Sequence, residues 1–427
     1  MAERGTMVED SRISGFYKLT REERVKKLQE LTGLSDEDLQ PLVDPGKVDM
    51  DILDHMIENV VGSMTLPLGI ATNFRINGRD YLIPMAIEEP SVVAAASNAA
   101  RMARPHGGFT ATDTGPIMRA QIQAVNVATP YAAKLKILEH RDEILQLAND
   151  QDPILVKFGG GARDLTVKIV ESSVGPMVVT ELIVDTRDAM GANAVNTMAE
   201  AVAPSIERIT GGKVYLRILS NLADLRLVRA RATFDKELLG GEEVVDGIVA
   251  AWAFAEADPY RCATHNKGIM NGIDAVVIAT GNDFRAIEAG AHSYASIGGY
   301  SSLTKYEKDA DGNLVGSIEI PMAVGLVGGA TKVHPVARAC VKILGVKTAV
   351  ELGHVIASVG LAQNLAALRA LAAEGIQRGH MALHARNVAA TAGAKGDMID
   401  LVAEQMVRER KINVERAKEI LSELSKK

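Results

Sequence analysis

Residues 118–124 read "MRAQIQA", and this stretch decides how the middle of the chain folds. Met118, Ala120 and Ile122 are small or apolar, and they alternate with polar residues. Alternation with a period of two is typical of a β-strand that buries one face. The sequence therefore predicts a strand here, from which the neighbouring segments can be interpreted.

The segments that follow predict an alternation of helices and strands. The predicted elements are a helix over 132–148, strands over 165–169 and 177–184, a helix over 195–209 and a strand over 213–219. Pro204 lies inside the second helix and is expected to kink it or end it early, because proline has no backbone N–H. Together with the strand at 118–124, the order is β-α-β-β-α-β, the ferredoxin-like arrangement.

The flanks of this unit are richer in alanine, glycine and methionine, and helices are predicted over 91–104 and 347–373. We expect an α+β protein with a large, mostly helical domain interrupted by the small ferredoxin-like one. The charge density rises near the C-terminus, which is expected to form a helical appendage or an ordinary helical end of the large domain. The predicted parts are 1–114 with 225–375, then 115–224, and then 376–427.

The composition limits the classes of function. The chain has 427 residues, 47% of them hydrophobic, and a net charge of −7. A nucleic-acid-binding protein usually carries a basic field, so nucleic acid is not an expected partner. The apolar run at 320–331 is too short to cross a bilayer, so no membrane association is expected. Cys262 and Cys340 form no recognisable disulfide framework or metal motif, which favours a reducing, cytoplasmic location.

The segment "DAMGAN" at 188–193 is the best candidate for a nucleotide site. It lies between a predicted strand and a predicted helix, where glycine lets the backbone approach a ligand. Free N–H groups at a helix start suit a pyrophosphate. The alternative is a plain turn, and the glycine-rich segments at 159–164 and 325–332 have the same ambiguity. The chain contains no GxGxxG and no Walker A sequence.

Several polar residues are ambiguous when taken singly. Asp283 has the position of a helix N-cap, which is a structural role. His380 and His384 are one helical turn apart and could bind zinc, but no third ligand with suitable spacing is evident. Lys267 lies in "ATHNKGIMNGID" at 263–274, a stretch whose glycines are typical of a loop and which has no acidic residue closer than Asp274.

Six segments taken together are far more specific. They are "ENVVG" at 58–62, "EEPSVVAAAS" at 88–97, "DAMGANAVNTMAEA" at 188–201, "HNKGIMNGID" at 265–274, "ATGNDFRA" at 279–286 and "GHMALHARN" at 379–387. In this order they make the chain resemble the class II 3-hydroxy-3-methylglutaryl-CoA (HMG-CoA) reductases. The resemblance extends from about residue 12 to the C-terminus.

The resemblance implies a fold and a reaction. The family has a large CoA-binding domain, an inserted ferredoxin-like nucleotide domain and a C-terminal flap. Its unit is a homodimer with active sites at the subunit interface, and a higher oligomer stays open. Its members interconvert HMG-CoA and mevalonate plus CoA with two nicotinamide hydrides, through mevaldyl-CoA and mevaldehyde.

The resemblance also assigns roles to residues. Lys267 would polarise the thioester carbonyl, and Glu89 would exchange a proton with the substrate oxygen. Asp283 would lie between these two and tune both, and His380 on the flap would protonate the CoA thiolate. No nucleophilic side chain and no metal would be needed. The expected substrate contacts are Ser91, Arg261, Asn271 and His384.

The cofactor expected from the resemblance is NADH, with NADPH as the alternative. Asp152 matches an acid of NADH-using members, since a carboxylate there would bind a ribose 2′-OH and repel a 2′-phosphate. Asp150 could be the relevant acid instead, or the stretch could simply be a solvated loop. The expected contacts in the 188–193 segment are Asp188, Met190, Gly191, Ala192 and Asn193.

Two other functions compete with this one. The chain could reduce a different acyl-CoA, which a panel of thioesters would reveal. It could also be a non-catalytic ferredoxin-like protein that binds RNA. The acidic charge and the aromatic content of 4% argue against RNA, because few rings are available to stack on bases.

Overall fold

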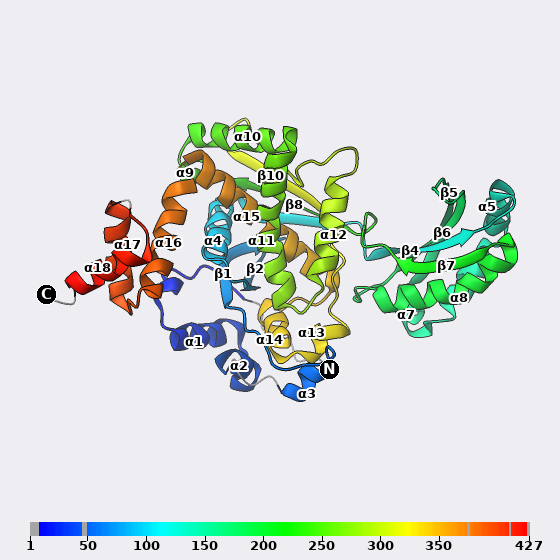
Figure 1. Ribbon diagram of the computed structural model, residues 1–427, viewed down its shortest axis with the longest axis horizontal. Helices are drawn as coiled ribbons and strands as arrows, with labels where there is room; N and C mark the ends of the chain where they lie inside the picture. The colour runs from blue at the N-terminus through cyan, green and yellow to red at the C-terminus, as the bar shows by residue number, and fades with distance from the viewer. Residues whose placement is uncertain (1–7, 45–48, 374–375, 410, 425–427) are drawn as a thin grey trace.

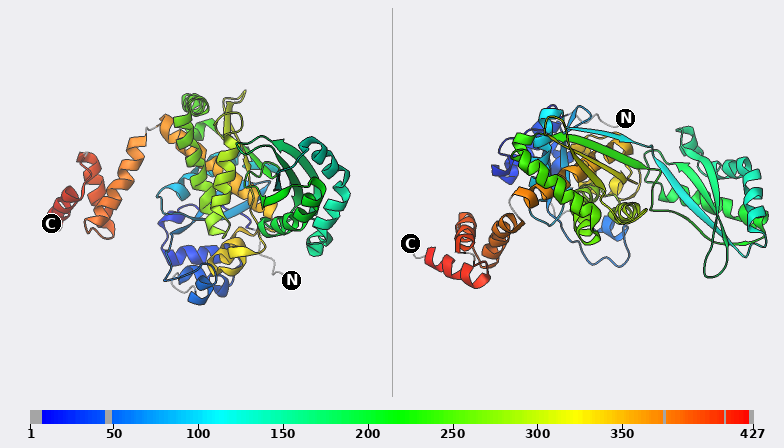
Figure 2. Two further views of the ribbon diagram at one scale, coloured as in Figure 1. Left: turned by 45° about the vertical axis from the view of Figure 1, so that its right-hand side comes forward. Right: turned by 90° about the horizontal axis from the view of Figure 1, so that it is seen from above.

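The computed structural model describes residues 8–44, 49–373, 376–409 and 411–424, and the side chains of 376–383 lie outside this description. The small sheet with its helices lies at one end of the molecule, and α16–α18 lie at the other (Figures 1 and 2). A larger sheet with several packed helices occupies the middle.

The small sheet is antiparallel, with strand order β5-β6-β4-β7. Its interior carries the alternation seen in the sequence, because Met118, Ala120 and Ile122 are buried on the side covered by helices. The order of strands and helices is the one predicted. The elements are β4 (Ile117–Val125), α5 (Pro130–Glu139), α6 (Arg141–Asn149), α7 (Pro153–Lys157), β5 (Gly161–Val170), β6 (Met177–Asp185), α8 (Ala192–Thr210) and β7 (Lys213–Leu219).

One prediction about these helices was wrong, and one of the two alternatives predicted at Pro204 is excluded. The single helix predicted over 132–148 is divided at His140, whose N–H is shared between the carbonyls of Lys136 and Ile137. Pro204 does not end α8 early, since the helix continues to Thr210. Pro204 is exposed, while neighbouring residues such as Val202 and Ile206 are buried, so packing holds the helix across the missing hydrogen bond.

The larger sheet was not predicted, because the flanks were expected to be mostly helical. It has six strands in the order β2-β1-β3-β8-β10-β9. Its strands are scattered between helices, because β1 to β3 precede the small sheet in the chain whereas β8 to β10 follow it. The strands are β1 (Leu68–Ile76), β2 (Arg79–Ala86), β3 (Phe109–Asp113), β8 (Leu227–Phe234), β9 (Thr304–Lys308) and β10 (Leu314–Pro321).

The central helix of the molecule is α15 (Ala349–Ala373), which packs against α4, α10, α11 and strand β8. By length and composition it is the one helix in the described residues that could span a membrane. However, 67% of the relevant window is buried inside the fold. A helix that is apolar on all sides suits the core of a large protein. The helices around it are α4 (Val92–Ala103), α10 (Glu242–Ala257), α11 (Pro259–Ala279) and α12 (Phe284–Ala295).

The remaining elements lie at the edges of this core. The C-terminal helices α16–α18 have a hydrophobic cluster of their own, built around Val402, Met406 and Ile420. These peripheral elements are η1 (Phe16–Lys18), α1 (Arg21–Thr32), α2 (Asp36–Val43), α3 (Met50–Asp54), η2 (Arg104–His106), α9 (Lys236–Leu239), α13 (Gly329–Val333), α14 (Pro335–Leu344), α16 (Ile376–Thr391), α17 (Asp397–Glu409) and α18 (Val414–Leu424).

Candidate functional site

Lys267 has an acidic partner that is distant in the sequence. Its Nζ lies 3.0 Å from Oε2 of Glu89, and Nδ2 of Asn271 donates to the same oxygen over 3.2 Å. Lys267 and Asn271 are four residues apart on α11, so they share one helix face. The Lys267 side chain is 61% exposed and the Glu89 side chain 35% exposed. The structure thus places a cation, a carboxylate and an amide together where solvent or a substrate can reach them.

The segment around Lys267 is not the loop that its glycines suggested, but the middle of the helix α11. Gly272 allows this helix to approach α15 closely, since a Cβ at position 272 would lie 2.8 Å from the Cβ of Gln363. Gly360 on α15 allows the same close approach from the other helix, because a Cβ at position 360 would lie 2.8 Å from Cδ1 of Ile273 on α11. The glycines therefore serve helix packing, and the close packing fixes the position of Lys267.

Ser91 follows Glu89 and Pro90 at the start of α4. Its φ is 75° and its side chain makes no capping hydrogen bond to the helix. A left-handed conformation is uncommon for a residue other than glycine, and such residues concentrate at functional sites. The exposed Ser91 hydroxyl thus lies beside the Lys267–Glu89 pair in a conformation that helix formation does not explain.

Two neighbours of Lys267 on α11 are buried and chemically quiet. Burial lowers the pKa of His265 to about 4, with a smaller effect from the charge of Arg261. Its Nε2 lies 2.9 Å from the hydroxyl of Thr304. Burial also raises the pKa of the Cys262 thiol, which disfavours the thiolate. These two side chains support the helix, and the structure provides no activated cysteine nucleophile among them.

The structure does not bring Asp283 to Lys267 within one chain. Asp283 caps α12, where its Oδ1 accepts from the backbone N–H groups of Arg285 and Ala286, and its Oδ2 lies 3.1 Å from the Arg285 guanidinium. Lys267 lies 12 residues before Ala279, the last residue of α11, which is about 18 Å at 1.5 Å per residue. Asp283 follows beyond that end, so the expected arrangement of Asp283 between Lys267 and Glu89 is absent from the single chain.

The 188–193 segment forms a tight turn that enters α8. Gly191 is the N-cap with φ 112°, and a Cβ there would lie 2.7 Å from Cγ2 of Thr186. No side chain caps α8, so its first N–H groups, including those of Ala192 and Asn193, are free for an anion. Asp188 has a structural role, because its Oδ1 accepts from the N–H of Ala349 at the start of α15. The backbone here fits a nucleotide phosphate, whereas the Asp188 carboxylate is already engaged.

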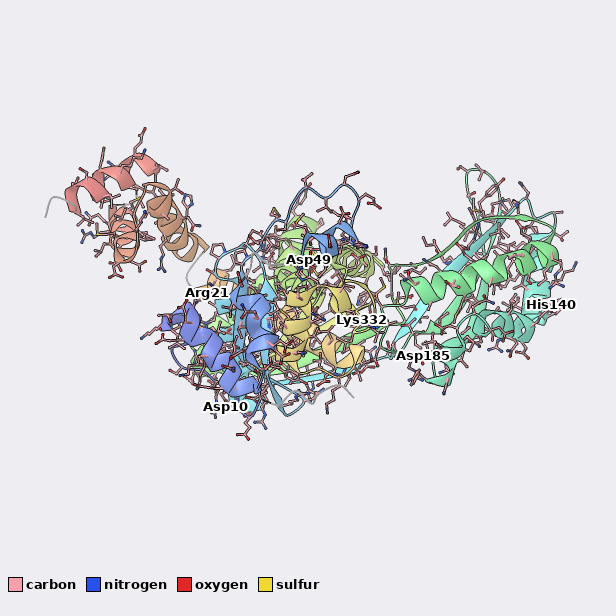
Figure 3. All side chains as sticks on the ribbon, turned by 90° about the horizontal axis from the view of Figure 1, so that it is seen from below. Asp10, Arg21, Asp49, His140, Asp185 and Lys332 are labelled. Carbon is pink, nitrogen blue, oxygen red and sulfur yellow. The ribbon has the colours of Figure 1, made fainter. Side chains whose placement is uncertain are left out.

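The segment that carries Asp283 lies close to the 188–193 turn. Oδ1 of Asn282 accepts from the N–H of Gly325 over 2.8 Å, and the carbonyl of Asp188 accepts from the N–H of Leu326 over 2.9 Å. Segments 282–283, 324–327 and 188–191 therefore meet in space. Figure 3 shows the adjacent Asp185 at the end of the small sheet that faces the rest of the molecule, with His140 at the far end. One chain thus holds two separate groups: Glu89 with Lys267, and Asp283 with the turn.

The other predicted residues have simpler positions. Asp152 caps α7 by accepting from the N–H of Leu155, and Asp150 accepts from the side-chain amide of Gln146. Arg261 is half-buried in the first turn of α11, and Met190 is half-buried beside the core. His384 on α16 is exposed. The His380 side chain lies outside the described residues.

A basic pocket was missed by the sequence analysis. It measures about 440 Å³ and is lined by Arg12, Arg75, Arg101 and Arg104, without an acidic residue. Within the described part of the chain, Arg75 and Arg101 form no ion pair. Three of these arginines are far apart in sequence, and no spacing pattern connects them. Arg12 and Arg104 pair with Asp10 and Asp80, which do not line this pocket, so Arg75 and Arg101 are the lining cations that suit a phosphate group.

Comparison with known proteins settles the family. The model of the hydroxymethylglutaryl-coenzyme A reductase family matches residues 20–385. The chain belongs to this family. It is a class II HMG-CoA reductase, a nicotinamide-dependent oxidoreductase that acts on a CoA thioester.

Individual relatives agree with this family. The chain is 65% identical to the Archaeoglobus fulgidus 3-hydroxy-3-methylglutaryl-coenzyme A reductase over 97% of its own length and 95% of the relative's. A probable enzyme of the same name from Borreliella burgdorferi is 36% identical, with 84% and 83% covered. A class II HMG-CoA reductase from Streptococcus pneumoniae, solved bound to NADPH in open conformations, matches with a TM-score of 0.81 and 42% identity, over 95% of this chain and all of that one (100%).

Proposed function

We propose that the chain interconverts HMG-CoA and mevalonate through the Lys267–Glu89 pair. In the reductive direction the thioester consumes two hydrides and two protons and yields a primary alcohol and free CoA. The steps pass through mevaldyl-CoA and mevaldehyde. A bound nicotinamide supplies the hydride in each half of the reaction. The observation that carries this proposal is the 3.0 Å contact between the exposed Lys267 ammonium and the Glu89 carboxylate.

The pair has complementary tasks. The Lys267 ammonium stabilises the negative charge that develops on the carbonyl oxygen. Glu89, held by Lys267 and Asn271, moves a proton to or from that oxygen. Ser91 and Arg261 hold the polar parts of the HMG group. His380 and His384 on α16 lie in the part of the chain that we propose closes over the CoA thiol, where His380 protonates it.

The separation of Asp283 from Lys267 supports a site shared by two copies. A two-fold dimer would bring the Asp283 group of one copy to the Lys267 group of the other, forming two equal sites. Apolar residues in and just after the "ENVVG" segment are exposed in the single chain, Val61 to 100% and Met64 to 87%. A second copy that packs here would cover them. We therefore propose a homodimer as the catalytic unit, with any higher assembly built from dimers.

The basic pocket supports CoA as the carrier of the acyl group. Ser91 lies at the start of α4 and Arg101 near its end, which is a separation of about 15 Å at 1.5 Å per residue. The pantetheine arm of CoA is long enough to connect a thioester at one end of the helix with phosphates at the other. Arg75 and Arg101 would bind these phosphates, with the paired Arg12 and Arg104 beside them. The proposed CoA site therefore lies in residues 1–114 and 225–375, the domain for which the family resemblance implied this role.

We propose that the cofactor lies between the 188–193 turn and α7, within residues 115–224, with residues 376–427 as the flap. The free N–H groups of α8 would bind its pyrophosphate. NADH is the proposed cofactor because Asp152 starts α7 with a carboxylate. NADPH is the alternative cofactor, because the Streptococcus pneumoniae reductase was solved bound to NADPH. The compartment proposed is the cytoplasm.

The decisive experiment is HMG-CoA-dependent oxidation of NADH and NADPH, followed in parallel at the nicotinamide absorbance. The proposal expects turnover with HMG-CoA and a lower KM for NADH than for NADPH. Asp152→Ala should reduce that preference without abolishing turnover. No oxidation with either cofactor would exclude the proposed reaction, and faster turnover of another acyl-CoA would change the substrate.

A further inference from the structure

Arg226 is a buried cation that no part of the reaction scheme uses. Only 4% of the residue is exposed. Its Nη1 donates to the Thr186 hydroxyl over 3.0 Å and to the carbonyls of Ala189 and Met190 over 3.2 and 3.0 Å. Its Nη2 donates to the Val324 carbonyl over 2.6 Å. All four acceptors are neutral, which is unusual for a buried charge.

The charge persists in this environment. Burial lowers the pKa of Arg226 to about 10, which the charges of Asp185 and Asp188 partly oppose. The guanidinium therefore stays protonated near neutral pH. A planar fork with five N–H donors can bond several backbone carbonyls at fixed angles, which the single ammonium of lysine cannot do.

The acceptors of Arg226 belong to the two segments that meet beside Asp283. Ala189 and Met190 are in the turn that enters α8, and Val324 precedes Gly325, whose N–H donates to Asn282. The Thr186 hydroxyl also lies 3.1 Å from the Ala189 carbonyl, so Thr186 and Arg226 hold the same atom. One guanidinium thus connects the proposed cofactor turn to Val324, and through the neighbouring Gly325 to Asn282 beside Asp283.

We propose that Arg226 is a positioning residue that fixes the 188–191 turn relative to Asp283. By occupying the carbonyls of Ala189 and Met190, it orients the same peptide units so that their N–H groups face the entry of α8. By bonding the Val324 carbonyl, it keeps Asn282 and Asp283 at a fixed position relative to that turn. The inference rests on the proposed function, because it assigns the turn to the nicotinamide cofactor.

The experiment compares Arg226→Lys, Thr186→Val and wild type in steady-state assays, together with a fluorescence titration of NADH without HMG-CoA. Arg226→Lys keeps the charge but loses the fork, so we expect the KM and Kd for NADH to rise about tenfold. The value of kcat should also fall, because Asp283 is displaced. The KM for HMG-CoA should change by less than about twofold, since the Lys267 group is not touched. Thr186→Val removes one acceptor and should shift the same constants by about threefold.

Arg229→Gln is the matched control. Arg229 lies on the same strand, β8, and its ion pair with Glu319 is at the surface, so its substitution should leave both KM values unchanged. Each variant is checked by thermal melting. A merely structural role would lower Tm and the active fraction while leaving the NADH KM and Kd unaltered. That result for Arg226→Lys would overturn the inference, and if this variant does not fold, the same result for Thr186→Val would do so.

The controls separate the inference from the function on which it rests. A wild-type protein without HMG-CoA-dependent oxidation would remove the proposed function itself. An active wild type whose Arg226→Lys and Thr186→Val variants keep normal NADH constants would leave the function standing and remove only the role of Arg226.

Discussion

The two groups of functional residues are built in different ways. In the Lys267 group, Lys267 and Asn271 project from a long helix, α11, whose close contact with α15 is set by Gly272 and Gly360, and Glu89 lies between β2 and α4. The Asp283 group lies on turns, where a buried guanidinium and backbone hydrogen bonds maintain the geometry. The first group therefore depends on helix packing and the second on polar contacts. A change in one type of support should affect its own ligand and spare the other.

The largest effect should come from the cation of the first group. Lys267→Ala removes the charge that stabilises the oxyanion, and kcat should fall by roughly 10²–10³-fold or more. The measurement is the HMG-CoA assay with both cofactors, with circular dichroism to confirm folding. Lys305→Ala is the control, since Lys305 forms an exposed pair with Glu256 away from this site. A variant with near-normal kcat would exclude Lys267 from the reaction.

Mixing two inactive variants tests whether the groups come from different copies. Lys267→Ala and Asp283→Asn homodimers should each be nearly inactive. When the two are dissociated and reassociated together, half of the dimers should contain both chains, and each of these has one intact site. About a quarter of the wild-type rate should then return. If the mixture stays inactive while its subunits demonstrably exchange, both residues act within one chain.

A single glycine substitution can disturb the packing of α11 against α15 while the charged residues of the site stay unchanged. Gly272→Ala would place a Cβ 2.8 Å from that of Gln363. Such overpacking should lower the free energy of unfolding by about 1–3 kcal/mol and shift α11 away from α15. Gly268→Ala is the matched control in the same helix, where a Cβ meets nothing within 4 Å. It should be neutral or stabilising by up to about 1 kcal/mol. Equal denaturation midpoints for the two variants would contradict this account of the glycines.

The smallest effect concerns pH. Asp274 follows Asn271 on the same face of α11, and burial, with a hydrogen bond to Glu288, raises the pKa of Asp274 to about 8. The folded state therefore binds a proton that the unfolded chain loses near pH 4, so this stabilisation declines from about pH 4 and is gone above about pH 8. Asp274→Asn keeps the shape without the proton. Between pH 5 and 8, the Tm of the wild type should fall by a few degrees more than the Tm of this variant. Parallel Tm profiles would contradict the assignment.

The small sheet could be predicted from the sequence and the large one could not. Strand β4 of the small sheet alternates cleanly, as Met118, Ala120 and Ile122 show, because one of its faces is covered by helices. In the large sheet, β2 is buried along most of its length and shows no alternation. The strands β8 and β10 do alternate, but α9 to α12 separate them in the sequence, so their pairing is not evident from the pattern. The helix α11 was missed for a related reason. Gly268 and Gly272 resemble loop residues, and only the neighbouring helix explains why Gly272 is there.

The same limit applies to the site. The resemblance to a family predicted that Lys267 and Glu89 act together, and the structure places them in contact. Nothing in the sequence showed that Asp283 lies beyond the end of α11, at the start of α12, because that depends on the length and direction of α11. The basic pocket and the contacts of Arg226 are also properties of the folded chain, since their residues are too far apart in sequence for any spacing rule.

The apolar length of α15 has a consequence for synthesis. As it leaves the ribosome, this helix satisfies the same length and hydropathy criteria as a membrane-spanning segment. Its main packing partners α4, α10 and α11 all precede it in the chain, so a surface that can receive it is already present when it emerges. The order of elements along the chain thus shortens the time during which this long apolar helix is exposed to insertion machinery or to aggregation.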